Sequence, residues 1–316
     1  MKLHRFAGVV AASAMLFGFG TAGAFPDKPI QYIVPFAPGG ESDLTARLQA
    51  EVFAKKYKQQ MVVINRPGAG GGLVWGQLNG LPSDGHTLAG INLPHIVLQP
   101  LEGNVQYKTE DMTPVYFFQY TADIIVVGES SPFKTYQDLV KAAKAAPGKV
   151  SLAGAGMFSG NHMALERLNK LAGIKTVYVP YNSTNDLLNP VMGGHVAGAM
   201  TYLPVAIQQK GKIRMLAVAS EKRHPALPEV PTFKEVGLDW VDGTFRGVAV
   251  PKSTARDLQK KVSDLMYELN QDPEMRKKMS DLGYDLVDIT LEKMPAFVAE
   301  RTRVSMGDAK AAGLLK

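Results

Sequence analysis

The 316-residue sequence predicts an α/β protein in which most neighbouring strands are parallel. Three observations support this class. Short apolar runs rich in β-branched residues alternate with segments of helical periodicity. A strand, a loop of small residues and a helix start follow one another twice, once in each half of the chain. The chain is also long enough for two packed domains.

Residues 1–24 predict a secretory signal peptide that is cleaved after Ala24. Lys2, His4 and Arg5 form a basic start, and residues 9–19 form an apolar core. This core is shorter than the roughly 20 apolar residues of a membrane span. Removing 24 of the 316 residues leaves 292 for an exported, periplasmic protein.

The composition excludes several classes of function. The chain has no cysteine, which excludes disulfides, a thiolate metal site, a cysteine nucleophile and a lipid-modified cysteine. The formal charge is +6, and loss of the signal, which carries two basic and no acidic residues, lowers it to +4. Its basic residues are scattered, which favours a solvated surface over a nucleic-acid groove.

The first strand, loop and helix are predicted within residues 30–54. Residues 30–34 form the strand, and two prolines and two glycines in residues 35–40 break it. Ser42 or Asp43 is the predicted N-cap, and the spacing of Leu44, Leu48 and Val52 predicts the buried helix face. Free backbone N–H groups at the helix start, with Gly39 and Gly40 before it, favour a bound anion. An ordinary strand-to-helix turn is the alternative reading.

Two further strands are predicted at 61–64 and 87–91, with a short helix at 73–78. The glycine run at 65–72 matches neither GxGxxG nor a P-loop, so we do not predict a nucleotide site. Asn92 to His95 form a polar exit from the third strand. In an α/β sheet, ligands bind near such carboxyl ends of strands.

The second half repeats the same unit. A strand at 124–127, a helix at 136–145 and a strand at 150–153 precede a loop in which Ser159 is a candidate helix cap. The two helix N-termini, one from each half, could face each other across a cleft and share one anion. The chain continues with further strands and then a mostly helical tail, the strands being predicted at 177–179, 198–201, 214–219 and 245–250.

The chemistry favours binding over catalysis. His162 and His95 are candidate ligand contacts, although each could instead bond only to the protein. No histidine pair has the HExxH spacing, and we predict no metal and no cofactor. Residues 156–160 do not match the nucleophile elbow GxSxG, and no third group is identifiable to orient His162 toward Ser159. We therefore do not expect an enzyme.

Many of these motifs resemble one family, the periplasmic substrate-binding proteins of tripartite tricarboxylate transporters. The resemblance spans essentially the whole mature chain. The motifs that carry it are Pro29-Ile30, Val34 to Gly40 with Asp43, Asn65 to Gly71, Pro82 to Leu88, Ala146 to Lys149, Val179 to Tyr181, Gly193-Gly194 and Leu227 to Thr232.

The resemblance implies a two-domain periplasmic binding-protein fold with two crossovers and a ligand cleft between the domains. Domain 1 would comprise residues 25–123 plus 246–316, and domain 2 residues 124–245, with hinges near Ile124 and Phe245. It also implies a small carboxylate ligand and two membrane partners, the large and small integral-membrane subunits of the transporter. A sensor that presents its liganded form to a signalling receptor is the alternative. Oligomerisation is not indicated, so we expect a monomer.

In such proteins the carboxylate is held by the two loops identified above, partly through water. The predicted ligand-binding residues come from these loops and from two nearby segments. They are Pro38, Gly39, Gly40, Glu41, Ser42, Asp43, Asn92, His95, Phe158, Ser159, Gly160, Asn161, His162 and Tyr181.

Three departures from the family pattern bear on the ligand. Phe158 stands where a small residue is usual, Asn182-Ser183 replaces Lys-Gly, and His195-Val196-Ala197 replaces Gln-Val-Asp. The last change removes an acid that could pair with a ligand amine. An aromatic or otherwise uncharged-tailed carboxylate is therefore favoured over an amino acid, and a dicarboxylate stays open.

Overall fold

The computed structural model describes residues 25–315, and the predicted signal peptide lies outside them. Within this range, no helix has both the length and the apolar character that a bilayer crossing needs. The predicted α/β class is confirmed, because strands and helices alternate along most of the chain.

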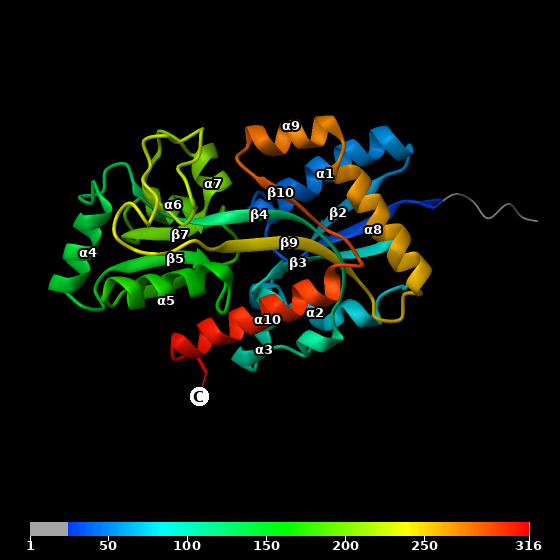
Figure 1. Cartoon of the computed structure of the whole chain (residues 1–316), viewed down its shortest axis with the longest axis horizontal. Coiled ribbons are helices and arrows are strands. Elements are labelled where there is room, and N and C mark those ends of the chain that lie inside the picture. The colour runs from blue at the N-terminus through cyan, green and yellow to red at the C-terminus, as the bar shows by residue number, and fades with distance from the viewer. Residues whose placement is uncertain (1–24, 316) are drawn as a thin grey trace, which may run out of the picture.

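Ten strands join in one curled sheet (Figure 1). Its order is β2-β1-β3-β9-β4-β7-β5-β6, and β8 and β10 also pair with β4. The strands are β1 (Ile30–Val34), β2 (Met61–Asn65), β3 (Thr87–Leu93), β4 (Thr113–Gly128), β5 (Ser151–Ala155), β6 (Val177–Tyr181), β7 (Gly198–Tyr202), β8 (Ile213–Val218), β9 (Gly243–Val250) and β10 (Asp285–Ile289). β1 is parallel to β2 and β3, and β5 is parallel to β6 and β7, as predicted for neighbours in such a sheet.

Most helices gather in two groups around the two ends of the sheet, and α10 runs beneath the sheet from one group toward the other (Figure 1). We call β1–β3 and β10 with their helices the first lobe, and β5–β8 with theirs the second lobe. The first lobe has α1 (Glu41–Tyr57), α2 (Gly72–Gln77), α3 (His95–Glu102), α8 (Arg256–Asn270), α9 (Pro273–Asp281) and α10 (Met294–Ala311). The second lobe has α4 (Tyr136–Ala145), α5 (Gly160–Ala172), α6 (Leu188–Met192) and α7 (Leu203–Gln208).

The long strand β4 and the strand β9 connect the two lobes. Side chains on β4 alternate between the two sheet faces, as a strand requires. Ile124 and Val126 enter one core of the second lobe, and Ile125 and Val127 enter the other. Because both faces of this part of β4 are covered, its sequence is a continuous apolar run and does not alternate between apolar and polar residues.

Helix α1 corrects two predictions. It begins at Glu41, and Gly40 is its N-cap without a side-chain hydrogen bond, so neither Ser42 nor Asp43 is the N-cap. The predicted apolar face is also wrong in part. Val52 is buried, but Leu44 and Leu48 are only partly buried, whereas the polar Thr45 is fully buried. The reason is that α1 packs a polar stripe against Gln119 of β4.

Several other elements agree closely with prediction. Helix α4 has the predicted bounds, and Ser159 caps α5 by accepting a hydrogen bond from the His162 N–H at 3.1 Å. Three elements were not predicted in this form. α3 follows directly on β3, β4 starts eleven residues before the predicted Ile124 at Thr113, and β10 interrupts the tail that was predicted as mostly helical.

Candidate ligand-binding site

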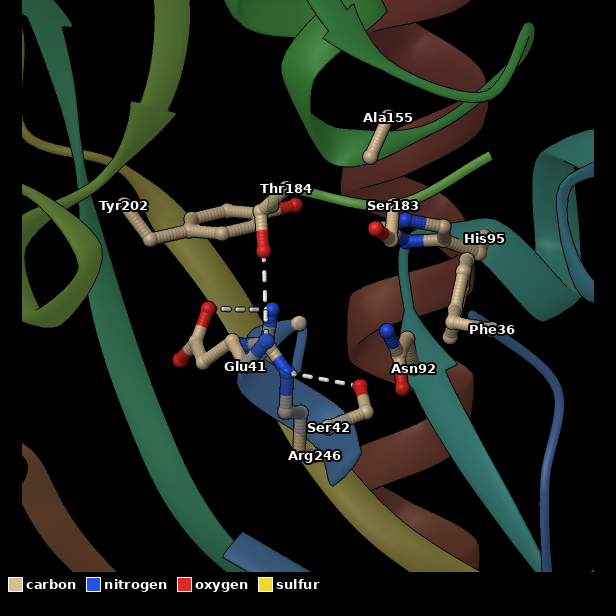
Figure 2. A pocket seen from close by; sticks show the side chains of 11 residues that line it. Phe36, Glu41, Ser42, Asn92, His95, Ala155, Ser183, Thr184, Tyr202 and Arg246 are labelled. Atoms are coloured by element: carbon tan, nitrogen blue, oxygen red, sulfur yellow. Dashed lines mark hydrogen bonds and ion pairs between the residues drawn. The ribbon is translucent and has the colours of Figure 1, made fainter. Parts of the chain in front are cut away.

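A small cavity lies where the two lobes meet (Figure 2). The first lobe contributes the β1–α1 loop, the starts of α1 and α3 and the end of β3, and the connecting strand β9 contributes its middle. The second lobe contributes the end of β5, the loop after β6 and the end of β7. The lining residues are Phe36, Gly40, Glu41, Ser42, Asn92, His95, Ala155, Ser183, Thr184, Tyr202 and Arg246.

The lobes touch at the edge of this cavity. The backbone N–H of Glu41 donates a hydrogen bond to Thr184 Oγ1 across the cleft at 3.2 Å. A Cβ atom added at Gly40 would lie 3.1 Å from Ser183 Cβ, which is tighter than ordinary contact. A side chain at this position would therefore press on the second lobe unless Ser183 shifted by a few tenths of an ångström.

Arg246 is the central cation of the cavity and is 3% exposed. Its Nη2 lies 2.6 Å from Glu41 Oε2, its Nε donates to Ser42 Oγ at 3.3 Å, and its Nη1 donates to Thr121. Its guanidinium carbon also lies 4.5 Å from the ring centroid of Tyr202. A guanidinium has five N–H donors, so two lack a partner among the described residues.

Glu41 is the counter-ion and is itself held in place. Gln119 Nε2 donates to Glu41 Oε1 at 2.8 Å, and Thr45 donates to Gln119 Oε1 at 3.0 Å. Burial raises the pKa of Glu41, and the neighbouring Arg246 acts in the opposite direction. The buried ion pair is close to neutral overall, which lowers the cost of keeping both charges away from water.

Hydroxyl groups surround the cation. Ser42 accepts from Arg246, Thr184 accepts from the Glu41 N–H, and Tyr202 accepts from the Thr244 hydroxyl at 3.1 Å. A hydroxyl that accepts one hydrogen bond still has its own proton to donate. The cavity is therefore rich in donors, which suits an anionic group.

His95 and Asn92 line the cavity as neutral groups. Burial, with a smaller contribution from Arg246, lowers the pKa of His95 to about 3, so the ring is neutral at physiological pH. Its Nδ1 is buried without a hydrogen-bond partner in the part of the chain that the structure describes. A neutral imidazole next to a cavity offers one donor and one acceptor.

Comparison with known proteins decides the family. The pattern of the tripartite tricarboxylate transporter family receptor (TctC) matches residues 45–310. The chain belongs to this receptor family. The family is one of binding receptors and not of enzymes, which confirms the prediction that this chain is not an enzyme.

Individual relatives agree. A protein encoded in the tcbD-tcbE intergenic region of Pseudomonas sp. strain P51 is 34% identical over 247 residues, which is 76% of this chain and 73% of that one. The periplasmic binding protein BugD has a TM-score of 0.86 at 27% identity, with 92% of this chain and all of BugD covered. MatC of Rhodopseudomonas palustris, solved with bound malate, has a TM-score of 0.81 at 25% identity, covering 91% and 99% of the two chains. The two-domain periplasmic binding-protein fold is thereby confirmed.

The second predicted binding loop, residues 158–162, makes most of its hydrogen bonds within its own segment of the chain. Asn161 Oδ1 accepts from the Ala155 N–H at 3.0 Å, and His162 Nδ1 accepts from the Phe158 N–H at 3.2 Å. The His162 ring stacks on Tyr178 with centroids 4.5 Å apart. Ser159 caps the helix. None of the residues 158–162 is among the eleven that line the cavity.

The other predicted residues divide between the cavity and its surroundings. Gly40, Glu41, Ser42, Asn92 and His95 line it. Asp43 instead accepts from the Gly39 N–H at 2.9 Å and pairs with Arg47, while Pro38 lies outside the lining and Tyr181 lines a neighbouring cavity. The role of all fourteen in ligand binding stays a prediction.

Six lining residues were not predicted, namely Phe36, Ala155, Ser183, Thr184, Tyr202 and Arg246. One of them carried a usable signal. Arg246 interrupts the apolar run of residues 245–250, and a charge inside a buried strand requires a partner or a function. Phe36 lies in the predicted loop itself, and the other four residues reach the cavity only through the contact between the lobes.

Among residues 25–315, no three His, Cys, Asp or Glu side chains are grouped so that they could hold a metal ion.

Proposed function

We propose that this receptor captures a small organic carboxylate in the periplasm and delivers it to the large and small membrane subunits of a tripartite tricarboxylate transporter. The observation that carries the proposal is Arg246, a buried guanidinium with two N–H groups left over in a cavity lined by hydroxyls. The family match supports transport, and the malate bound to MatC supports a carboxylate.

The energies are sufficient for a transport receptor. A charge-assisted hydrogen bond contributes about 1.5 to 3 kcal/mol. Two from Arg246 and one or two from hydroxyls would provide much of the roughly 8 kcal/mol of a micromolar complex, before the costs of immobilisation are subtracted. Closing the lobes over the ligand would add the burial of its tail.

The two lobes are the proposed domains, with residues 25–123 and 246–316 in one and 124–245 in the other. The proposed hinge positions, Ile124 and Phe245, lie on β4 and β9. Away from the cavity, Gln99 of the first lobe donates to the backbone oxygen of Phe158 in the second at 3.5 Å. An ion pair between Arg167 and Asp308 and an apolar cluster of Leu98, Met163 and Ala309 also join the lobes. A membrane partner that separates the lobes would have to break these contacts in order to release the ligand.

The test is isothermal titration calorimetry of the mature protein against C3 to C8 monocarboxylates, dicarboxylates and benzoate, each paired with its amide. A carboxylate that binds while its amide does not would support the proposal. The variant Arg246→Gln should abolish that binding. If no carboxylate in the set binds a protein shown by mass spectrometry to be free of ligand, the proposal fails.

A further inference from the structure

The central cavity is too small to hold a whole ligand. Its volume is about 20 Å³, which is room for about one water molecule. A carboxylate head can replace such a water, but a chain of several carbons cannot fit beside it. If the proposed function is right, the rest of the ligand must lie elsewhere.

A larger hollow adjoins this cavity and shares Phe36 with it. Its volume is about 240 Å³, and the loops of both lobes form its walls. An apolar cavity of about 150 Å³ is large enough for benzene. In Figure 2, Phe36 and His95 lie on the opposite side of the small cavity from Glu41 and Tyr202, so Phe36 marks the side from which a tail would leave.

The walls of the hollow combine apolar side chains with exposed polar groups. Pro35, Phe36, Met157, Pro180 and Tyr181 supply most of the larger side chains, and three glycines expose backbone between them. Such walls favour burial of hydrocarbon. Tyr181 and Asn182 add polar groups that a neutral tail can tolerate.

The charges that line the two cavities are unequal. Arg246 provides the single positive charge, whereas Glu41 and Glu102 provide two carboxylates. Glu102 is the last residue of α3, so the negative end of that helix adds to its field. A head carboxylate can use Arg246, but among the described residues no cationic side chain lines the hollow to receive a second carboxylate at the tail.

We propose that the ligand is a monocarboxylate with an uncharged, mainly apolar tail, and that this tail passes Phe36 into the hollow formed by the two lobes. Glu102 then selects against dicarboxylates. Glu102 is partly exposed, so solvent screens both its repulsion of a second carboxylate and its attraction for an ammonium group. The larger penalty for either charged tail is the loss of its hydration in the hollow.

Three ligands with six carbons each separate the possibilities: hexanoate, adipate and 6-aminohexanoate. Their tails end in a methyl group, a carboxylate and an ammonium group. By calorimetry at pH 7.5 and low salt, we expect hexanoate to bind at least roughly tenfold more tightly than adipate. Hexanoate should also bind more tightly than 6-aminohexanoate, which would have to desolvate its ammonium group.

A second experiment reverses the charge of Glu102 at the hollow. Glu102→Lys should narrow or reverse the preference for hexanoate over adipate. Glu110→Lys is the matched control, because Glu110 is exposed on the same lobe and lines neither cavity, so the preference should not change.

The outcomes distinguish this inference from the proposed function. Adipate binding as tightly as hexanoate in the unmodified protein would overturn the inference and leave the carboxylate receptor intact. Tighter binding of 6-aminohexanoate would overturn it too, and would assign Glu102 to a ligand cation. A preference that Glu102→Lys leaves unchanged would refute the role of Glu102. If neither hexanoate nor any other carboxylate binds, both proposals fail.

Discussion

The buried pair of Arg246 and Glu41 allows stability and ligand binding to be separated in one set of variants. Arg246→Gln leaves the Glu41 carboxylate buried without its counter-ion, 2.6 Å from where the guanidinium nitrogen was. Removing one partner of a buried pair costs about 3 to 5 kcal/mol, whereas replacing both partners is often close to neutral. We therefore expect Arg246→Gln to be strongly destabilised and the double variant with Glu41→Gln to recover most of the loss.

The pH dependence gives an independent check on this reasoning. In Arg246→Gln the pKa of Glu41 should rise further, because burial already raises it and the opposing cation is gone. An acid whose folded-state pKa is raised costs stability as pH increases above its unfolded value. The deficit of the single variant relative to the unmodified protein should thus be larger at pH 8 than at pH 5.

Binding should follow a different pattern from stability. Loss of two charge-assisted N–H donors is worth about 3 to 6 kcal/mol, so Arg246→Gln and the double variant should both bind a carboxylate roughly 10² to 10⁴-fold more weakly. Glu41→Gln alone removes a negative charge beside the anion and should bind at least as tightly as the unmodified protein.

Urea unfolding at pH 5 and pH 8 and calorimetry with the best carboxylate supply both readouts. The reasoning is refuted if the double variant is no more stable than Arg246→Gln, because the two charges would then be uncoupled. Retention of full affinity by a folded Arg246→Gln would refute the assignment of Arg246 as the carboxylate anchor.

Three further predictions follow from single side chains. Gly40→Ala should weaken ligand binding, because the added methyl presses on the second lobe, and should change the unfolding free energy little. Gly160→Ala would place its Cβ 2.2 Å from Thr244 Oγ1. This variant should lose about 1 to 3 kcal/mol of stability in urea unfolding. Burial lowers the pKa of His162 to about 4. The folded protein therefore loses stability as the pH falls from about 6.5 toward 4. His162→Gln should remove roughly 2 kcal/mol of the decrease in unfolding free energy between pH 7 and pH 5. Burial, reinforced by a second aspartate, raises the pKa of Asp123, which costs stability as pH rises. Asp123→Asn should therefore raise the unfolding midpoint at pH 8 more than at pH 4, and an equal change at both would contradict it.

Local signals in the sequence predicted much of the fold. The cap at Ser159 and the helix at 136–145 were predictable because capping and periodicity act within a few residues. The buried face of α1 was not, because the polar stripe of Glu41, Thr45 and Gln49 is buried only when Gln119, far along the chain, lies against it. Periodicity describes which residues could face a core, and it does not identify a polar partner from another strand.

The same distinction explains the candidate site. The loop at the start of α1 was found because glycines next to a helix start mark a close approach to backbone, and Gly40 does make one. The contribution of the second lobe was placed at residues 158–162 by analogy between the two loops, whereas the structure presents Ser183, Thr184 and Tyr202 to the cavity. These three come from separate segments that meet only through sheet pairing and contact between lobes, so no local pattern contains them.

Arg246 has both a local sequence signal and a position that depends on contacts between distant segments. Its strand lies between β3 of the first lobe and β4, which runs into the second lobe, so its side chain emerges where the lobes meet. Glu41, Ser42 and Thr121 hold the guanidinium in place, so it needs little reorganisation when an anion binds. A binding group that is already ordered costs less free energy on binding and accepts only ligands that fit its geometry. Because Glu41 already neutralises much of the Arg246 charge, the pair offers N–H donors to one carboxylate but little net positive charge for a second one. The residue that makes the cavity suitable for an anion therefore also restricts which anions it should accept.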